Sequence, residues 1–203
     1  FRSDQLRLAS AGYFRDLAVR AASGPIPAVQ KEARDALYSE KGVHRSLSAD
    51  TQREILPYLA ALDAASARGD RAAIAASSLE AVRLLCLDLS GAAEKQGAFM
   101  LIDYAQLAVG ETLRAPAPDW SAAERTLSLA ESHRRILADR RDVMPDTRFD
   151  ADFDTLAATV DRHDRDGAVH DLAAIRRSFD GFRARSDGAL PDQALASANP
   201  GGQ

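Results

Sequence analysis

Acidic and histidine side chains are concentrated between Phe149 and Asp171, in the stretch FDADFDTLAATVDRHDRDGAVHD. Carboxylates and imidazoles are the side chains that hold divalent metal ions in proteins. Two histidines stand on either side of the turn RDG, where two antiparallel helices would meet and bring their side chains together. A pair of solvated surface histidines near a turn is the alternative interpretation. The candidate metal ligands are His163, His170, Asp161 and Asp166.

The same stretch has part of the pattern of a calcium-binding loop. Asp150, Asp152 and Asp154 occupy alternate positions, and Asp161 falls at the twelfth place of such a loop. However, Thr155 takes the place of the glycine that the sharp turn requires, and the segment TLAAT is apolar and helical in character. Capping and attraction to the positive end of a helix dipole explain the three aspartates more simply. We therefore expect a helix start here.

A haem held between helices would need axial ligands that project into a core. Met100, together with His133 or His170, is the available combination, and the chain has no Cys-x-x-Cys-His motif for covalent attachment. Core packing is the alternative role of Met100. The sequence therefore predicts no cofactor, and a divalent metal or haem stays open as the alternative.

Catalytic motifs are lacking in this sequence. It contains no glycine-rich phosphate loop, no Gly-x-Ser-x-Gly elbow and no Cys–His pair in a known motif context. The single cysteine, Cys86, stands in the apolar segment LLCLDL and is expected to be a buried core residue. The carboxylates alternate with arginines at helical spacing, which is typical of a solvated face. We predict that the chain is not an enzyme.

Composition excludes two classes of partner. The 203 residues carry a formal net charge of −4, and arginines and aspartates are interspersed without a concentrated basic face, so nucleic acid binding is not expected. No apolar run reaches the roughly 18 residues of a membrane span, so the chain is not expected to be an integral membrane protein.

The elements that must position these residues are helices. Hydrophobic side chains recur at helical spacing along about eight segments, and no stretch alternates as a β-strand would. Predicted helix starts include capping boxes at Thr51–Glu54 and Ser121–Glu124, an N-cap at Asp70 and a first-turn proline at Pro27. The fold class expected is all-α, with about eight antiparallel helices.

An internal repeat is visible at a shift of 97 residues. It places Leu59 on Leu156 and the turn at Arg68 on the turn at Arg165. We predict a duplicated up-down four-helix bundle, since four apolar stripes can shield one another from water. Two unrelated helical hairpins, or stacked helical repeats of the tetratricopeptide type, are the alternatives. The predicted domains are 1–90, a first four-helix unit; 91–186, a second unit that could pack with the first as one domain; and 187–203, a mobile tail.

The segment GVHRSL, from Gly42 to Leu47, resembles the opening of the Gly-x-His-x-x-Glu motif of imelysin-like periplasmic proteins. Those proteins are also built from duplicated four-helix bundles. Leu47 stands where the motif has its glutamate, and the chain is not assigned to that family. The simpler role of His44 is that of a histidine at a helix end, which is favourable beside the negative end of the helix dipole.

These features predict a non-catalytic helical binding or accessory module with a protein partner. A bacterial, periplasmic or other extracytoplasmic setting is the location expected. The alternative is a periplasmic bundle that binds a metal or haem through the second-half hairpin. The sequence leaves the oligomeric state open.

Overall fold

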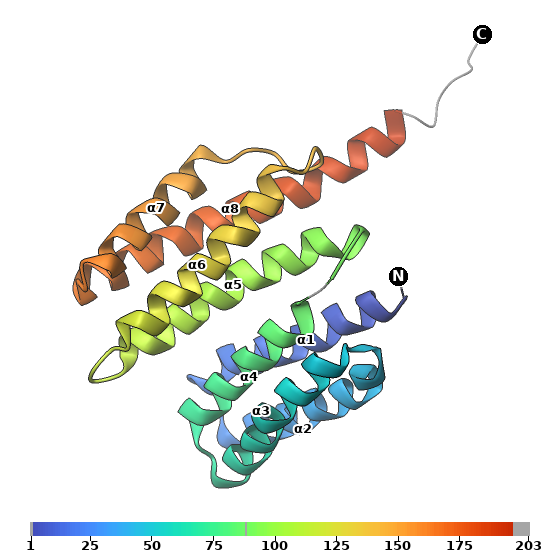
Figure 1. Ribbon diagram of the computed structural model, residues 1–203, viewed down its shortest axis with the longest axis vertical. Coiled ribbons are helices and arrows are strands. Elements are labelled where there is room, and N and C mark those ends of the chain that lie inside the picture. The colour runs from blue at the N-terminus through green and yellow to red at the C-terminus, as the bar shows by residue number, and fades with distance from the viewer. Residues whose placement is uncertain (1, 88, 197–203) are drawn as a thin grey trace. The chain divides into compact units, whose positions relative to one another are not determined.

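The computed structural model describes residues 2–87 and 89–196, and it confirms the predicted all-α class (Figure 1). Within those residues the structure contains eight α-helices, one short 3₁₀-helix and no β-strand. The duplication stays a prediction. The elements are α1 Arg2–Ala21, α2 Ile26–Val43, η1 His44–Ser46, α3 Ala49–Arg68, α4 Arg71–Cys86, α5 Ala92–Arg114, α6 Trp120–Ala138, α7 Thr147–Asp161 and α8 Arg165–Ala196.

Several helix ends follow the predicted local signals. The Asp70 carboxylate accepts a hydrogen bond from the Ala73 amide at 3.1 Å and so caps α4. Gly69 ends α3 with a φ of 69°, in the left-handed region that glycine adopts without strain. Pro27 lies in the first turn of α2, where its missing N–H is not needed.

The two predicted capping boxes are wrong by about two or three residues. The cap of α3 is the Ser48 hydroxyl, which accepts a hydrogen bond from the Thr51 amide at 3.1 Å. The cap of α6 is Asp119, whose carboxylate accepts the Ala122 amide at 2.9 Å, so Ser121 already lies inside the helix. In both cases a side chain earlier in the sequence can accept hydrogen bonds from the free amides of the first turn. The helix therefore starts at that earlier residue.

The first of two compact units comprises residues 1–111. Its helices α1 to α4 form a closed ring, in which α1 packs against α2 and α4, and α3 packs against α2 and α4. Helix α5 contacts this ring through an ion pair between Arg15 and Asp103 at 2.7 Å, and through the Tyr104 hydroxyl, which donates to Glu80 at 2.9 Å. The centre of the ring includes Phe14, Leu17, Ile55, Leu62, Ile74, Leu84 and Leu85, all buried.

A buried arginine completes this first unit. The Arg7 side chain is only 8% exposed, and its Nε donates to the Leu85 carbonyl at 3.3 Å. A second guanidinium nitrogen donates to the Leu87 carbonyl. These carbonyls belong to the last turn of α4 and its cap, where no intrahelical donor remains. Arg7 therefore ties α1 to the C-terminal end of α4.

The second unit comprises residues 112–203, and in it α7 packs against both α6 and α8. Its core contains a cluster of phenylalanines from α7 and α8. The Phe149 ring centroid lies 6.2 Å from that of Phe153, 5.5 Å from Phe179 and 5.1 Å from Phe182. These distances are typical of stabilising aromatic pairs.

The contacts divide the chain after residue 111, whereas the sequence places a boundary after residue 90. The boundary at residue 90 stays a prediction. Helix α8 continues to Ala196, through the first part of the predicted tail, and residues 197–203 lie outside the described residues. Among the helices of the described segments, none combines the length and apolarity that crossing a membrane requires.

Candidate functional site

A large groove lies between two neighbouring helices in each unit. In the first unit the groove lies between α2 and α3 and has a volume of about 560 Å³. In the second unit it lies between α6 and α7 and has a volume of about 720 Å³. Both volumes fall within the range of ordinary ligand pockets. The two grooves differ in what covers their apolar floor.

The α2–α3 groove has an open apolar floor. Leu56, Leu59, Ala60 and Asp63 line it from α3, at the i, i+3, i+4, i+7 spacing of one helix face, and Leu37 faces them from α2. The Leu56 side chain is 53% exposed although it lies within a concave surface. Exposed leucines are ordinary when they are scattered, but an exposed leucine on the floor of a groove indicates a contact surface.

A histidine and a buried carboxylate form one wall of the α2–α3 groove. As predicted, His44 lies at the C-terminal end of α2. Its Nδ1 lies 2.5 Å from Oε1 of Glu40, whose side chain is only 4% exposed. We assign the Nδ1 proton as the donor in this hydrogen bond, since an ionised carboxylate can only accept. The other ring nitrogen, Nε2, is then the atom available for further interactions.

The ends of the α2–α3 groove carry opposite charges. Lys41 and Arg45 line it near η1, and Asp63 lines it toward the other end of α3. Among the residues that the structure describes, these three side chains have no ion-pair or hydrogen-bond partner. Unpaired charges beside an apolar floor can select a partner by its charge.

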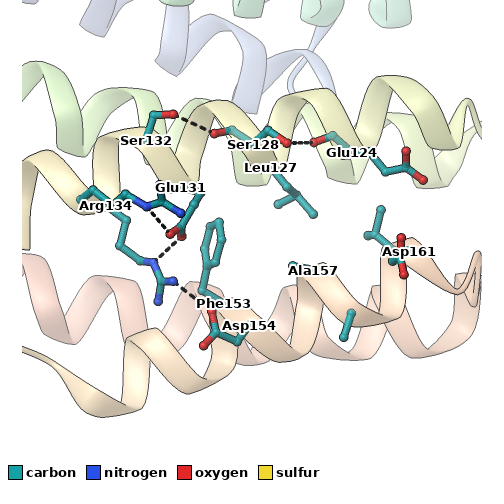
Figure 2. A pocket seen from close by; sticks show the side chains of 13 residues that line it. Glu124, Leu127, Ser128, Glu131, Ser132, Arg134, Phe153, Asp154, Ala157 and Asp161 are labelled. Atoms are coloured by element: carbon teal, nitrogen blue, oxygen red, sulfur yellow. Dashed lines mark hydrogen bonds and ion pairs between the residues drawn. The ribbon is translucent and has the colours of Figure 1, made fainter.

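The apolar floor of the α6–α7 groove is covered by a side chain, whereas the floor of the α2–α3 groove is open. Phe153 points from α7 toward α6, and the Arg134 side chain lies beside it (Figure 2). The guanidinium carbon of Arg134 is 4.9 Å from the centre of the Phe153 ring. Phe153 is only 3% exposed. Arg134 therefore acts as a lid over the aromatic floor through a cation–π contact.

Three carboxylates hold Arg134 in place. Glu131 accepts from Nε at 2.7 Å, and Asp150 and Asp154 each accept from a terminal guanidinium nitrogen at 3.0 Å. Burial alone would raise the pKa of Glu131, but hydrogen bonds from Arg134 and Arg135 outweigh it and lower that pKa. Asp150 and Asp154, considered above as calcium ligands, thus lie in helix α7 and bind an arginine.

Of the predicted metal ligands, Asp161 lines the far end of the α6–α7 groove, and His163 lies two residues beyond it, outside the lining. His163 follows the end of α7 with a φ of 56° and stacks on Trp120 at a centroid distance of 5.1 Å and an angle of 7°. Its Nε2 is 3.4 Å from a carboxylate oxygen of Glu124. Among the described residues, this acid is the polar partner that the structure gives to the His163 side chain.

Besides His163, the predicted metal ligands lie on the surface around the same turn. Asp161 ends α7, and Asp166 and His170 lie in the first two turns of α8; all three are exposed. Within residues 2–87 and 89–196, no three His, Cys, Asp or Glu side chains form a group that could hold a metal ion. The metal site stays a prediction.

Two of the three residues considered as haem ligands are only partly accessible, whereas His170 is exposed. Met100 in α5 and His133 in α6 are half-buried, and burial lowers the pKa of His133. Cys86 is buried, as predicted, and its burial raises the pKa of the thiol to about 12. Such a thiol is not a reactive nucleophile near neutral pH.

Four of the nine positions that line the α2–α3 groove fall on lining positions of the α6–α7 groove under the predicted 97-residue shift. Positions 37, 56, 60 and 63 of the first groove become 134, 153, 157 and 160, and all four of these line the second groove. Leu37 and Leu56 thus correspond to Arg134 and Phe153. The half-buried Leu37 and the exposed Leu56 stand where the other groove has the lid Arg134 and the aromatic ring of Phe153.

Sequence reasoning missed both grooves and two of their main residues. Glu40 could have been found, because it stands four residues before His44 on one helix face. Arg134 was not recognisable as a lid, since its aromatic partner comes from another helix. Comparisons of this chain with models of protein families, with curated proteins and with solved structures found no match.

Proposed function

We propose that this chain is a non-catalytic binding module, and that its docking site for a protein partner is the α2–α3 groove. The observation that carries the proposal is the 53% exposure of Leu56 on the floor of a groove of about 560 Å³. Complete burial of an exposed leucine side chain contributes about 1.5–3 kcal/mol, so covering the 53% of Leu56 that is still exposed would stabilise a complex by about 0.8–1.6 kcal/mol.

The contrast with the second groove supports this choice of site. In the α6–α7 groove the aromatic floor is already covered by Arg134, so a partner would have to break three ion pairs to reach it. In the α2–α3 groove Leu56 and Leu59 are accessible without a rearrangement. A preformed site costs less to occupy.

The lining of the α2–α3 groove also supports binding over catalysis through a serine, threonine or cysteine nucleophile. Its residues include His44 and Glu40 but neither a hydroxyl nor a thiol that could act as a nucleophile. The predicted metal and haem ligands, His163 and His170 among them, have no part in this proposal.

The test is a selection of helix-forming peptides from a display library on the folded chain. We expect enriched peptides to bind the wild type and to lose binding to Leu56→Asp, since a charge on the floor would have to be desolvated. Leu6→Asp is the matched control: Leu6 is 50% exposed but lies on α1, outside the groove lining. Circular dichroism of both variants verifies that they are folded.

Equal binding to the wild type and Leu56→Asp would overturn the proposed site. Failure to enrich any peptide would overturn the proposed function.

A further inference from the structure

The charges at the two ends of the α2–α3 groove specify the partner further. Resting on the proposed function, we infer that the partner segment is an amphipathic helix with an acidic residue at the end that lies over Lys41 and Arg45. This inference concerns the chemical class of the partner, and it follows from four features of the groove.

The first feature is the helical character of both walls. The interior backbone groups of α2 and α3 are bonded within their own helices, except that Pro57 has no N–H to donate to the Arg53 carbonyl, so neither wall offers the row of free amides and carbonyls of a sheet edge. An extended peptide would leave its own backbone groups unpaired there, whereas a helix satisfies them internally. A helix is therefore the form in which a peptide fits this groove.

The second feature is the length of the floor. From Leu56 to Asp63 the groove follows two turns of α3, which at 1.5 Å per residue is about 10 Å. A partner helix of this contact length presents two or three apolar side chains at i, i+3 or i+4, and i+7. These side chains would pack against Leu37, Leu56 and Leu59.

The third feature is the order of charge along the groove. Lys41 and Arg45 are exposed at the end near η1, and Asp63 is exposed toward the other end. An acidic residue on the partner is attracted by the two cations and repelled by Asp63. The pairing therefore fixes which end of the partner lies near η1.

The fourth feature is the engagement of Glu40. This is the other carboxylate in the groove lining besides Asp63, and it is buried against His44 at 2.5 Å. Glu40 therefore does not form an ion pair with Lys41 or Arg45, so both cations can form an ion pair with a partner. The Nε2 atom of His44 adds a further polar group at the same end.

The experiment uses three synthetic helical peptides that differ at one end position. Each is about 18 residues long, because shorter peptides are marginally helical, and each has leucines at i, i+3 and i+7. The variable position is glutamate, glutamine or lysine, and fluorescence anisotropy with the full chain gives the dissociation constants. Two solvated ion pairs at about 0.5 kcal/mol each predict about five-fold tighter binding of the glutamate peptide than of the glutamine peptide.

Substitution of Lys41 tests directly whether the cations of the groove select an acidic partner. We expect Lys41→Glu to abolish the preference for glutamate and to favour the lysine peptide. Arg34→Glu is the matched control, because Arg34 is an exposed cation of the same helix that does not line the groove. It changes the net charge equally and should leave the order of the three peptides unchanged.

The outcomes separate this inference from the proposed function. If all three peptides bind equally and all lose binding to Leu56→Asp, the groove is a docking site but the acidic partner is wrong. Laurate, a fatty acid with an anionic carboxylate and an acyl chain, is tested as a second probe. If laurate binds the wild type but not Leu56→Asp, and no peptide binds, the groove is a site for an anionic acyl chain and both proposals are overturned. If Arg34→Glu alters the peptide order as much as Lys41→Glu, the preference reflects net charge and the inference fails.

Discussion

Removing the lid of the second groove should expose an apolar surface like that of the first. The variant is Arg134→Ala, and its effect follows from the contacts of this one side chain. Arg134 is 18% exposed and covers the Phe153 ring from 4.9 Å. We expect a loss of stability together with a gain of accessible apolar surface.

The magnitude can be worked out from the contacts. The three carboxylates that bind Arg134 are 26%, 49% and 69% exposed, so water screens these ion pairs and each contributes at most a few tenths of a kcal/mol. The cation–π contact is largely shielded from water, since Arg134 is 18% and Phe153 3% exposed, and it contributes about 1 kcal/mol. Loss of the packed alkyl stem adds to these terms. The free energy of unfolding should therefore fall by about 1–2 kcal/mol in total.

Urea denaturation measures the stability, and binding of an apolar fluorescent dye measures the exposure of Phe153. Arg135→Ala is the matched control, because Arg135 shares the partner Glu131 but is 76% exposed and lies over no ring of the described residues. The control should change stability by less than about 0.5 kcal/mol and should not increase dye binding.

The pH dependence of Arg134→Ala adds a second readout. The pKa of Glu131 is lowered in the folded state, so its stabilising contribution is present above its ordinary pKa and is lost as the pH falls through the folded value. The stability difference between wild type and variant should therefore shrink in acid. If Arg134→Ala and Arg135→Ala gave equal stabilities and equal dye binding, Arg134 would not be a lid and the comparison of the two grooves would fail.

Four further predictions concern buried or stacked groups. Cys86, whose pKa is raised to about 12, should react with a thiol reagent only after urea unfolds the chain; fast reaction of the folded protein would contradict its burial. Arg7→Met should lower the free energy of unfolding in urea by about 1–3 kcal/mol, because two helix-end carbonyls lose their donor. Burial lowers the pKa of His133, so the unfolded chain binds more protons in mild acid. The free energy of unfolding of the wild type should therefore fall as the pH drops below 6.5, the ordinary pKa of a histidine. In denaturation curves, His133→Leu should reduce this change of the unfolding free energy with pH. His163→Ala should change the emission of Trp120, the single tryptophan, and an unchanged spectrum would argue against the stack.

The helices could be predicted because their signals are local. The spacing of apolar residues within one segment predicts the face that is buried, and Asp70, Gly69 and Pro27 act on the backbone within one turn. The cap positions at Ser48 and Asp119 were missed because several neighbouring side chains could accept the same amides. Only the backbone geometry selects among them.

The candidate site could be predicted only in fragments. His44 was correctly placed at a helix end, but its pairing with the buried Glu40 depends on how α2 is oriented against the rest of the bundle. The acid-rich stretch was recognised, yet Asp150 and Asp154 bind Arg134 from the neighbouring helix. Such a contact between residues distant in the chain has no signature in either segment.

The amphipathic periodicity of this chain is a property of single segments, because each apolar stripe must leave water whichever neighbour shields it. All-α architecture follows from that alone. Whether a stripe is fully shielded is a different matter, since it depends on how closely two helices approach and on which side chain fills the gap between them. Leu56 and Phe153 both stand on apolar helix faces, yet one is 53% exposed and the other 3%, because Arg134 reaches over the phenylalanine from an adjacent helix, whereas the leucine has the shorter Leu37 beside it.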